Sequence, residues 1–262
     1  MRAALALAAG LCVAATGCIG APNPLAPHLR GSVGVPHHGV VTDAVAMPKK
    51  GDGYVLFRDD GVRWGSQRLI DILLRAAAKV SAERPGGSPL VVGDLSERFG
   101  GETTRHRSHR TGRDVDLLFY VTTPRGVPVR SPGFVPFESD GLGVSGSKKV
   151  YRFDVERNWA LVRSFLVDED VQWVFVSRPI EALLTEYALA LGEPVDILWR
   201  AETVMRQPGD SAPHDDHFHV RLACSVDEMV AGCQGGPRWP WQATVTPVEV
   251  SDAELLEALL ED

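Results

Sequence analysis

The spacing of apolar residues predicts three helices in the middle of the chain. Between residues 67 and 84, apolar side chains recur every three or four positions, and Ser66 stands where an N-cap residue belongs. Residues 156–169 and 178–192 show the same periodicity, and Gly192 is placed to end the second of these segments. We therefore expect three amphipathic helices, each with one buried face.

Short runs rich in β-branched and aromatic residues predict strands before, between and after these helices. The predicted strands cover residues 53–58, 89–96, 114–123, 171–177 and 217–224. The last of them alternates between polar and apolar positions, so we expect His217, His219 and Arg221 to share one face. Helices and strands mix without a regular β-α-β rhythm, which favours an α+β fold over a doubly wound α/β fold.

The first 18 residues predict export and a membrane anchor. Residues 1–17 combine a charged start with an apolar run that is too short to span a bilayer, as in a secretory signal peptide. The stretch that ends at Cys18 resembles a bacterial lipobox, which would make Cys18 the lipidated first residue of a protein held at a membrane surface. An ordinary signal peptide followed by a chance cysteine is the alternative.

The remaining boundaries follow from composition. Residues 18–41 are rich in Pro, Gly and small side chains, so we expect a tether between the anchor and the fold. The folded domain would then cover residues 42–245. A Ser-x-x-Glu capping box at Ser251 and a row of leucines predict a short helix in the tail, residues 246–262.

Charge and cysteine content limit the partners. The 262 residues carry a net charge of −7 and no broad basic region, so we expect no nucleic-acid partner. If Cys12 leaves with the signal and Cys18 carries the anchor, Cys224 and Cys233 remain in the domain. In an oxidising compartment this pair predicts a disulfide, whereas zinc thiolates would call for a second cysteine pair.

Two clusters of histidines form the candidate site. They contain His106 and His109 in "RHRSHRTGRDVDLLF", and His214, His217 and His219 in "HDDHFH". His109 could meet Asp116 across a turn, and a strand would place His217 and His219 side by side. A catalytic zinc site takes three protein ligands and a water molecule, and His109, Asp116 and either histidine of that pair would provide the ligands. The other histidine could then take a proton from the water.

This pattern resembles a known family of enzymes. His-x6-Asp, followed about a hundred residues later by His-x-His, is similar to the zinc peptidase fold of lysostaphin-type enzymes, D-alanyl-D-alanine metallopeptidases and hedgehog domains. More narrowly, "GGETTRHRSHRTGRDVDL", "HDDHFHVRLAC" and "VGDLSERFGG" resemble the penicillin-insensitive murein endopeptidases of bacteria, from about Gly31 to Cys233. The resemblance implies a central antiparallel sheet with flanking helices and a periplasmic zinc enzyme that cleaves D-alanyl-diaminopimelyl cross-links in peptidoglycan.

The resemblance also implies a role for each site residue. His109, Asp116 and His219 match the zinc ligands, His217 matches the general base, and His106 and His214 match accessory histidines that bind substrate or stabilise the intermediate. A zinc mechanism needs no serine nucleophile, which accounts for insensitivity to penicillin, an acylator of serine enzymes. In some relatives a middle stretch is linked to a second metal, but the comparable stretch at Asp140 lacks the histidine, so we exclude Asp140 from the ligands.

Three other interpretations of the sequence are less favoured. A non-catalytic, zinc-containing peptidoglycan-binding lipoprotein is the alternative, but it would have no need of the base His217. A zinc-storage protein would call for a longer run of histidines and acids. A solvated histidine-rich loop is disfavoured because apolar residues alternate with His217 and His219. The oligomeric state stays open.

Several neighbouring residues have two interpretations. Arg110 and Arg113 would suit peptide carboxylates or belong to a solvated loop, and Asp114 would orient a ligand histidine or be a turn acid. Trp239 and Trp241 would rim a saccharide groove or pack onto the core. We expect His28, His37 and His38 to belong to the tether.

Overall fold

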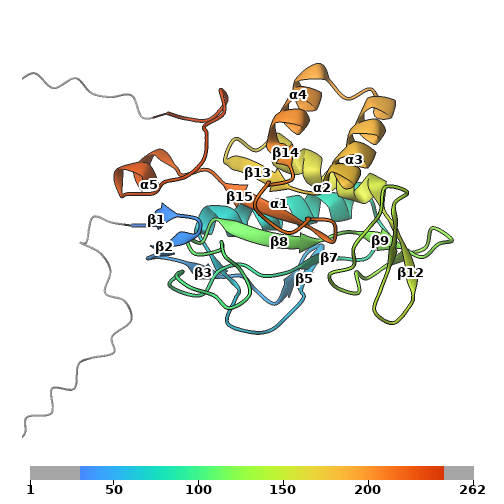
Figure 1. The fold of residues 1–262 in the computed structure, drawn as a ribbon, viewed down its shortest axis with the longest axis horizontal. Helices are drawn as coiled ribbons and strands as arrows, with labels where there is room; N and C mark the ends of the chain where they lie inside the picture. Colours follow the sequence, from blue (N-terminus) through green and yellow to red (C-terminus); the bar gives the residue numbers. More distant parts are fainter. Residues whose placement is uncertain (1–29, 245–262) are drawn as a thin grey trace, which may run out of the picture.

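The largest sheet of the structure carries the strands next to both histidine clusters. The computed structural model describes residues 30–244, and this sheet has seven strands (Figure 1). In spatial order they are β14 (Met205–Arg206), β13 (Val171–Phe175), β15 (His217–Leu222), β8 (Asp114–Leu118), β7 (Leu90–Val92), β5 (Tyr54–Leu56) and β4 (Lys50–Gly51). The fold is therefore mixed α+β, as expected from the sequence.

The expectation of an antiparallel sheet is wrong at two of its strand pairs. β13 pairs with β14, and β5 with β7, in parallel, whereas the other four neighbouring pairs are antiparallel. Each parallel pair is joined through helices: α1 (Gln67–Glu83) connects β5 to β7, and α3 (Arg178–Leu191) and α4 (Val195–Val204) connect β13 to β14. Two parallel strands can be joined only by a long crossover, so these helices lie between the paired strands along the chain.

The predicted helices are confirmed to within three residues at either end. In α1 the Ser66 side chain accepts a hydrogen bond from Leu69 N (3.3 Å), as an N-cap does, and α3 ends at Gly192 with φ of 70°. The third is α2 (Val155–Leu166), and the structure adds α4 and the short α5 (Val226–Val230). Figure 1 shows α1 running behind β8, and α3 and α4 beyond β13 and β14.

Three smaller sheets complete the described part of the chain. They are β1 (Ser32–Val35) with β2 (His38–Val41); β3 (Val45–Ala46) with β6 (Trp64–Gly65); and, in spatial order, β10 (Pro128–Val129), β9 (Val121–Thr122), β12 (Val150–Phe153) and β11 (Leu142–Val144). The predicted strand 114–123 is thus divided between β8 and β9, because the chain leaves the seven-stranded sheet after Leu118.

The pairing of β8 with β15 separates the core from the candidate site. In their antiparallel register Asp116 lies opposite His219, and Asp114 lies opposite Arg221. Opposite residues point to the same face, so these four polar side chains share one side of the sheet. Phe218 points to the other side and is fully buried. A slip of one residue would exchange the two faces, so the burial of Phe218, about 1.5–3 kcal/mol, helps to fix the register.

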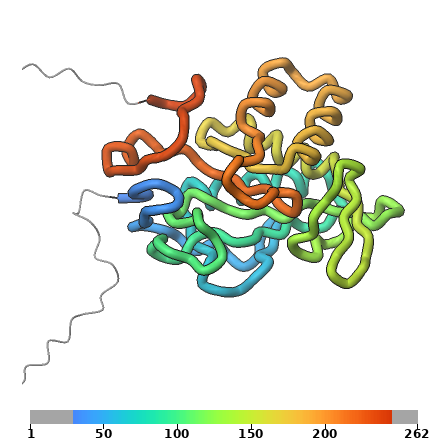
Figure 2. The backbone as a smooth tube through the Cα atoms, in the orientation of Figure 1, coloured from blue at the N-terminus to red at the C-terminus, as the bar shows by residue number. Residues whose placement is uncertain are grey.

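The described part of the expected tether is a hairpin. β1 and β2 pair over residues 32–41, the Ser32 hydroxyl donates to Thr111 O (2.6 Å), and Gly34 N donates to Gly232 O (2.9 Å). Figure 2 shows this hairpin beside the segment of α5. These partners lie far away along the chain, so the Pro- and Gly-rich composition gave no sign of them. The expected signal, Cys18 and the tail helix lie outside the described residues.

Two further findings concern the disulfide and the search for membrane-spanning helices. Cys224 and Cys233 form the predicted disulfide, with Cα atoms 5.9 Å apart, and it closes the turn that contains α5. No helix within residues 30–244 is long and apolar enough to cross a membrane.

Candidate metal centre

Asp116 is the centre of the candidate site. Its side chain is fully buried at the middle of β8, and its backbone bonds to the segment after β7 through Asp116 N to Asp94 O (2.9 Å) and Gly93 N to Asp116 O (2.7 Å). A Cβ at residue 93 would lie 3.0 Å from Asp116 O, so glycine allows this close approach. Neither carboxylate oxygen of Asp116 has a hydrogen-bond partner among the described residues.

His109 reaches Asp116 from the loop before β8. Its backbone φ of 64° lies in the left-handed region, which is rarely populated by a residue with a side chain. Its Nδ1 lies 2.9 Å from Leu95 O, a pure acceptor, so Nδ1 donates to this carbonyl and Nε2 is the nitrogen on the side of Asp116. That Nε2 lies 3.2 Å from Asp116 Oδ1 and has no hydrogen-bond partner in the described chain.

His219 faces Asp116 from the neighbouring strand. Its Nε2 lies 2.7 Å from Asp114 Oδ1, so Nε2–H donates to this buried carboxylate, and Nδ1, 3.7 Å from Asp116 Oδ1, offers the lone pair. Asp114 therefore orients a histidine of the site, which was one of the two interpretations of its sequence position. The same Asp114 Oδ1 accepts from Arg221 Nε (2.5 Å).

His217 lies nearer the mouth of the site than His219. Its Nε2 is 3.4 Å from Asp116 Oδ1, and its Nδ1 is 2.5 Å from Asp216 Oδ1. The Phe134 ring meets it edge-on, with ring centroids 5.2 Å apart. His217 is thus held between two carboxylates and covered on one side by an aromatic ring.

The accessory histidines lie on opposite sides of the centre. His106 stacks on His109 with ring centroids 4.2 Å apart, and its Nε2 lies 2.8 Å from Asp94 Oδ2 and 3.6 Å from Asp116 Oδ2. The ring of His214 lies 5.2 Å from that of His217, and its buried Nδ1 has no partner among the described residues. All six predicted site residues therefore converge on one place.

The donors fit a metal ion. Potential ligand atoms of His106, His109 and Asp116 lie within 4.8 Å of one another, so this group could hold a metal. His109 Nε2 and both oxygens of Asp116 face each other, and none of the three atoms has a hydrogen-bond partner among the described residues. A buried carboxylate in that position needs a cation to compensate it, which is a proton on the histidine or a metal ion, and nitrogen and carboxylate ligands suit zinc.

Burial and neighbouring carboxylates shift the pKa values in opposite directions. Burial lowers the pKa of His219 to about 3 and that of His214 to about 4, so both rings are neutral at pH 7. Burial also acts to lower the pKa of His217, but Asp116 and Asp216 outweigh it and raise this pKa to about 10. Burial would raise the pKa of Asp116, yet His109 and His217 hold it well below its usual value.

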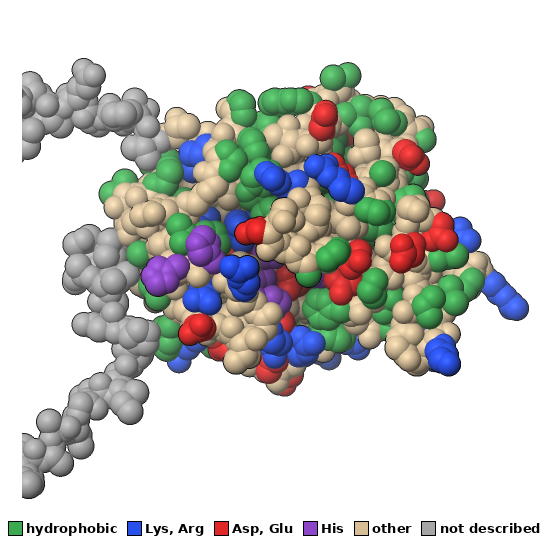
Figure 3. All heavy atoms as spheres, viewed as in Figure 1, with side chains coloured by type: hydrophobic (Ala, Val, Ile, Leu, Met, Phe, Trp, Pro, Cys, Tyr) green, Lys and Arg blue, Asp and Glu red, His purple; other side chains and the backbone are tan. Residues whose placement is uncertain are grey.

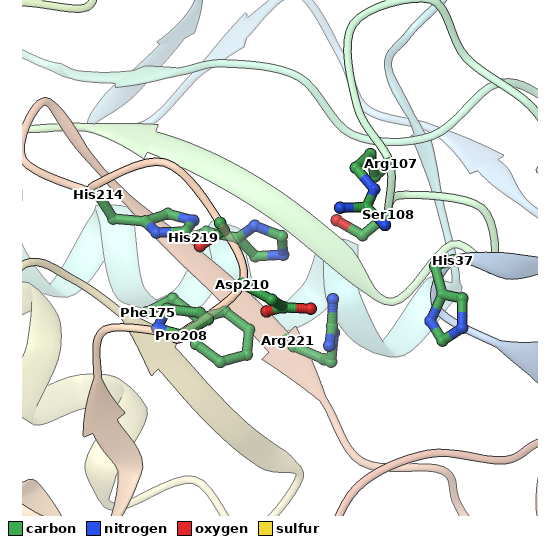
Figure 4. Close-up of a pocket in the computed structure, with 10 residues that line it drawn as sticks. His37, Arg107, Ser108, Phe175, Pro208, Asp210, His214, His219 and Arg221 are labelled. Carbon is green, nitrogen blue, oxygen red and sulfur yellow. The ribbon is translucent and has the colours of Figure 1, made fainter.

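The centre opens into a cleft with two cavities. The larger, about 540 Å³, is lined by Arg58, Asp94, His106, Phe134 and His217, and the smaller, about 250 Å³, by His37, Arg107, Phe175 and Arg221. His214 and His219 line both. Figure 3 shows one face of the molecule, with histidine side chains in its middle and left parts. Lys and Arg side chains lie around them, and acidic side chains are gathered to their right. Figure 4 shows the smaller cavity.

Some functional residues were missed or misread from the sequence. Asp94, at the end of the predicted strand 89–96, accepts hydrogen bonds from Arg58 and Arg105 and pairs with His106; its position after a buried strand was the available signal. His37 lies in the turn between β1 and β2 and lines the cleft, so it does not belong to a tether as expected. Arg113 faces neither substrate nor solvent: it is fully buried and donates to Leu222 O and Gln234 O.

Comparisons with known proteins agree with this geometry. A model of the penicillin-insensitive murein endopeptidase family matches residues 32–242. A Haemophilus influenzae protein named penicillin-insensitive murein endopeptidase is 29% identical over 214 residues, which cover 79% of this chain and 68% of that protein.

Proteins of the same name from Escherichia coli O157:H7 and Shigella boydii are each 26% identical to this chain. The matches cover 89% and 80% of this chain, and 80% and 71% of the respective relatives. The family model spans nearly all of the described residues, including all six site residues. The chain therefore belongs to the penicillin-insensitive murein endopeptidase family.

Proposed function

We propose that this protein is a zinc-dependent murein endopeptidase that hydrolyses D-alanyl-diaminopimelyl cross-links in peptidoglycan. The single observation that carries the proposal is the set of unpartnered buried polar atoms, His109 Nε2 and the Asp116 carboxylate, beside His217 in an open cleft. Such a set has no use in a purely structural role, because it leaves polar atoms buried without partners. The names of the relatives supply the substrate class.

We assign His109, Asp116 and His219 as the zinc ligands, in preference to His106. The Nε2 of His106 already lies 2.8 Å from Asp94 Oδ2, so this nitrogen carries a proton and has no lone pair to give. His219 has its other nitrogen bonded to Asp114, which leaves Nδ1 free on the side of Asp116. A histidine ligand held by a carboxylate in this way is common at zinc sites.

Zinc, when bound, would act as a Lewis acid on the scissile carbonyl and make a water molecule acidic at neutral pH. His217 serves as the general base. Without a cation, Asp116 supports a proton on His217 and raises the pKa of His217. A metal ion held by Asp116 would share that charge and leave Asp216 as the remaining support, so the pKa of His217 would fall and His217 could accept a proton from water.

The accessory histidines assist from either side of the reacting bond. His214 is neutral because burial lowers its pKa to about 4, and its ring, which lines both cavities, can offer a hydrogen bond to the oxyanion of the tetrahedral intermediate. His106, fixed by Asp94 and stacked on His109, is placed to contact the substrate.

The location of the protein and the finer description of its fold belong to the same proposal. Residues 1–17 would direct export, Cys18 would carry the lipid, and the enzyme would face the periplasm from a membrane surface. The pairing of β8 with β15, with ligands on both strands, is consistent with the lysostaphin and hedgehog type of zinc peptidase fold.

The test combines metal analysis with digestion of cross-linked muropeptide dimers. We expect the purified protein to hold one zinc ion and to cleave the dimers, to lose cleavage on chelation and to regain it with zinc. His217→Ala should keep the zinc and lose cleavage by a factor of about 10²–10⁴. If zinc-loaded wild type leaves the dimers intact but still binds peptidoglycan, the protein is instead a non-catalytic binding lipoprotein.

A further inference from the structure

The smaller cavity of the cleft has a cationic lining that the proposed chemistry does not use. Arg107 and Arg221 line it together with His37, and Asp210 is the one acidic residue among its described lining residues. Figure 4 shows Arg221 rising from β15 on one side, and Arg107 with Ser108 on the other. A cavity of about 250 Å³ with two arginines suits a small group that carries a negative charge.

Arg221 is held in place by one edge of its guanidinium and free at the other. Its Nε donates to Asp114 Oδ1, and its guanidinium lies 5.1 Å over the Phe175 ring. Its two terminal amino groups have no hydrogen-bond partner within residues 30–244, although only 17% of the side chain is exposed. A pre-oriented guanidinium with free donors is what bidentate recognition of a carboxylate requires.

Two other cations of the cleft, Arg58 and Arg105 in the larger cavity, are already neutralised by protein carboxylates. Arg58 donates twice to Asp94, and Arg105 pairs with both Asp94 and Asp60. Arg107, which lines both cavities, is exposed and forms no ion pair or side-chain hydrogen bond in the described part of the chain. The unneutralised positive charge of the cleft therefore lies on Arg221 in the smaller cavity and on Arg107, which the two cavities share.

The proposed substrate carries a negative charge close to the bond that breaks. In diaminopimelate each amino group shares its carbon atom with a carboxyl group. The residue that supplies the scissile nitrogen of a cross-link therefore has a carboxylate three bonds from the scissile carbonyl carbon. Arg221 is two residues from His219 on the same strand face, about 6.5–7 Å along β15, which matches that short separation.

We propose that the smaller cavity binds this carboxylate, and that Arg107 and Arg221 are specificity-determining residues for the leaving-group side of the cross-link. The inference rests on the proposed function, because it takes the reaction as given and assigns its orientation: the residue with the scissile nitrogen lies towards Arg221, and the D-alanyl residue lies towards Phe134 and the larger cavity. Ionic recognition at this point would favour free diaminopimelate residues over amidated ones.

The experiment compares two synthetic cross-linked peptide dimers on the zinc-loaded enzyme. They differ only in the carboxyl group beside the scissile nitrogen, which is a free carboxylate in one and a carboxamide in the other. We expect wild type to show kcat/KM about tenfold to a hundredfold higher for the carboxylate dimer, mainly through KM. Arg107→Ala and Arg221→Lys should bring this ratio close to one, and Asp210→Asn should increase it.

Arg125→Ala is the matched control, because Arg125 is exposed in the turn between β9 and β10 and lines neither cavity. Its ratio should equal that of wild type. The inference is overturned if wild type cleaves both dimers equally well, or if Arg107→Ala and Arg221→Lys lower both rates without changing the ratio. A wild type that cleaves neither dimer would instead refute the proposed function.

Discussion

The contact between Asp114 and His219 offers the sharpest test of the proposed zinc ligands. Asp114 is fully buried, accepts from His219 Nε2 at 2.7 Å and from Arg221 Nε at 2.5 Å, and carries the negative charge that balances Arg221. Asp114→Asn keeps the shape of the side chain and removes that charge. The neutral amide oxygen can still accept both hydrogen bonds, but it accepts them more weakly, holds His219 less firmly and leaves the charge of Arg221 beside the candidate site.

The expected loss can be estimated from the contacts. Removing a carboxylate that orients a ligand histidine typically lowers metal affinity about 10- to 100-fold, which corresponds to about 1.4–2.8 kcal/mol. Each charge-assisted hydrogen bond that is weakened should also cost about 1.5–3 kcal/mol of folding stability. We therefore expect Asp114→Asn to bind zinc at least tenfold more weakly and to unfold at lower urea concentration than wild type.

The assay is competition for zinc against a chromophoric chelator, with urea unfolding measured in parallel. Asp154→Asn is the matched control: Asp154 caps α2, accepting from Arg157 N at 3.2 Å, and asparagine is an equally good N-cap. Its zinc affinity should not change. The reasoning is refuted if Asp114→Asn binds zinc within twofold of wild type, or if the control weakens binding to the same extent.

Three further predictions concern stability. Burial would raise the pKa of Glu228, but Arg68 and the amides of Ser225 and Ser32 lower it below 4.5; a lowered folded-state pKa adds stability that is lost as pH falls. The urea concentration at the midpoint of unfolding should therefore decrease in wild type as the pH falls below about 5, and it should decrease less in Glu228→Gln. The same pH dependence in both proteins would contradict this. Replacing Cys224 and Cys233 by serine opens a loop with a sequence separation of 9 and should cost about 2–3 kcal/mol in urea unfolding, whereas unchanged stability would count against a structural disulfide. Zinc at a hundredfold excess over its Kd should raise the free energy of unfolding of wild type by about 2.7 kcal/mol. A melting temperature that stays the same after chelation would argue against a bound ion.

Local patterns in the sequence predicted the elements of the site, because the physics that forms them is local. The alternation around Phe218 predicted that His217 and His219 share a face, and the structure has this alternation in β15. The apolar stripe after Ser66 predicted α1 and its cap in the same way. Helix spacing and strand alternation need only neighbours along the chain.

Features that depend on distant partners could not be predicted. The hairpin at residues 32–41 is held by Thr111 and Gly232, and its Pro- and Gly-rich sequence alone is typical of a linker. Arg113 is polar and follows a glycine, so nothing near it in sequence indicates that Leu222 and Gln234 would bury it completely. Likewise Asp94 gains its role only because β7 lies next to β8.

The adjacency of β8 and β15 also sets the order in which the protein can become active. The two strands are about a hundred residues apart in sequence, so a chain still being synthesised holds one half of the metal centre and has no partner for it until His217 and His219 emerge. Long-range strand pairing of this kind forms late in folding. If the chain is exported unfolded, as proposed, the metal centre would first assemble outside the cytoplasm, and zinc capture and hydrolysis would then wait until β8 and β15 have paired there.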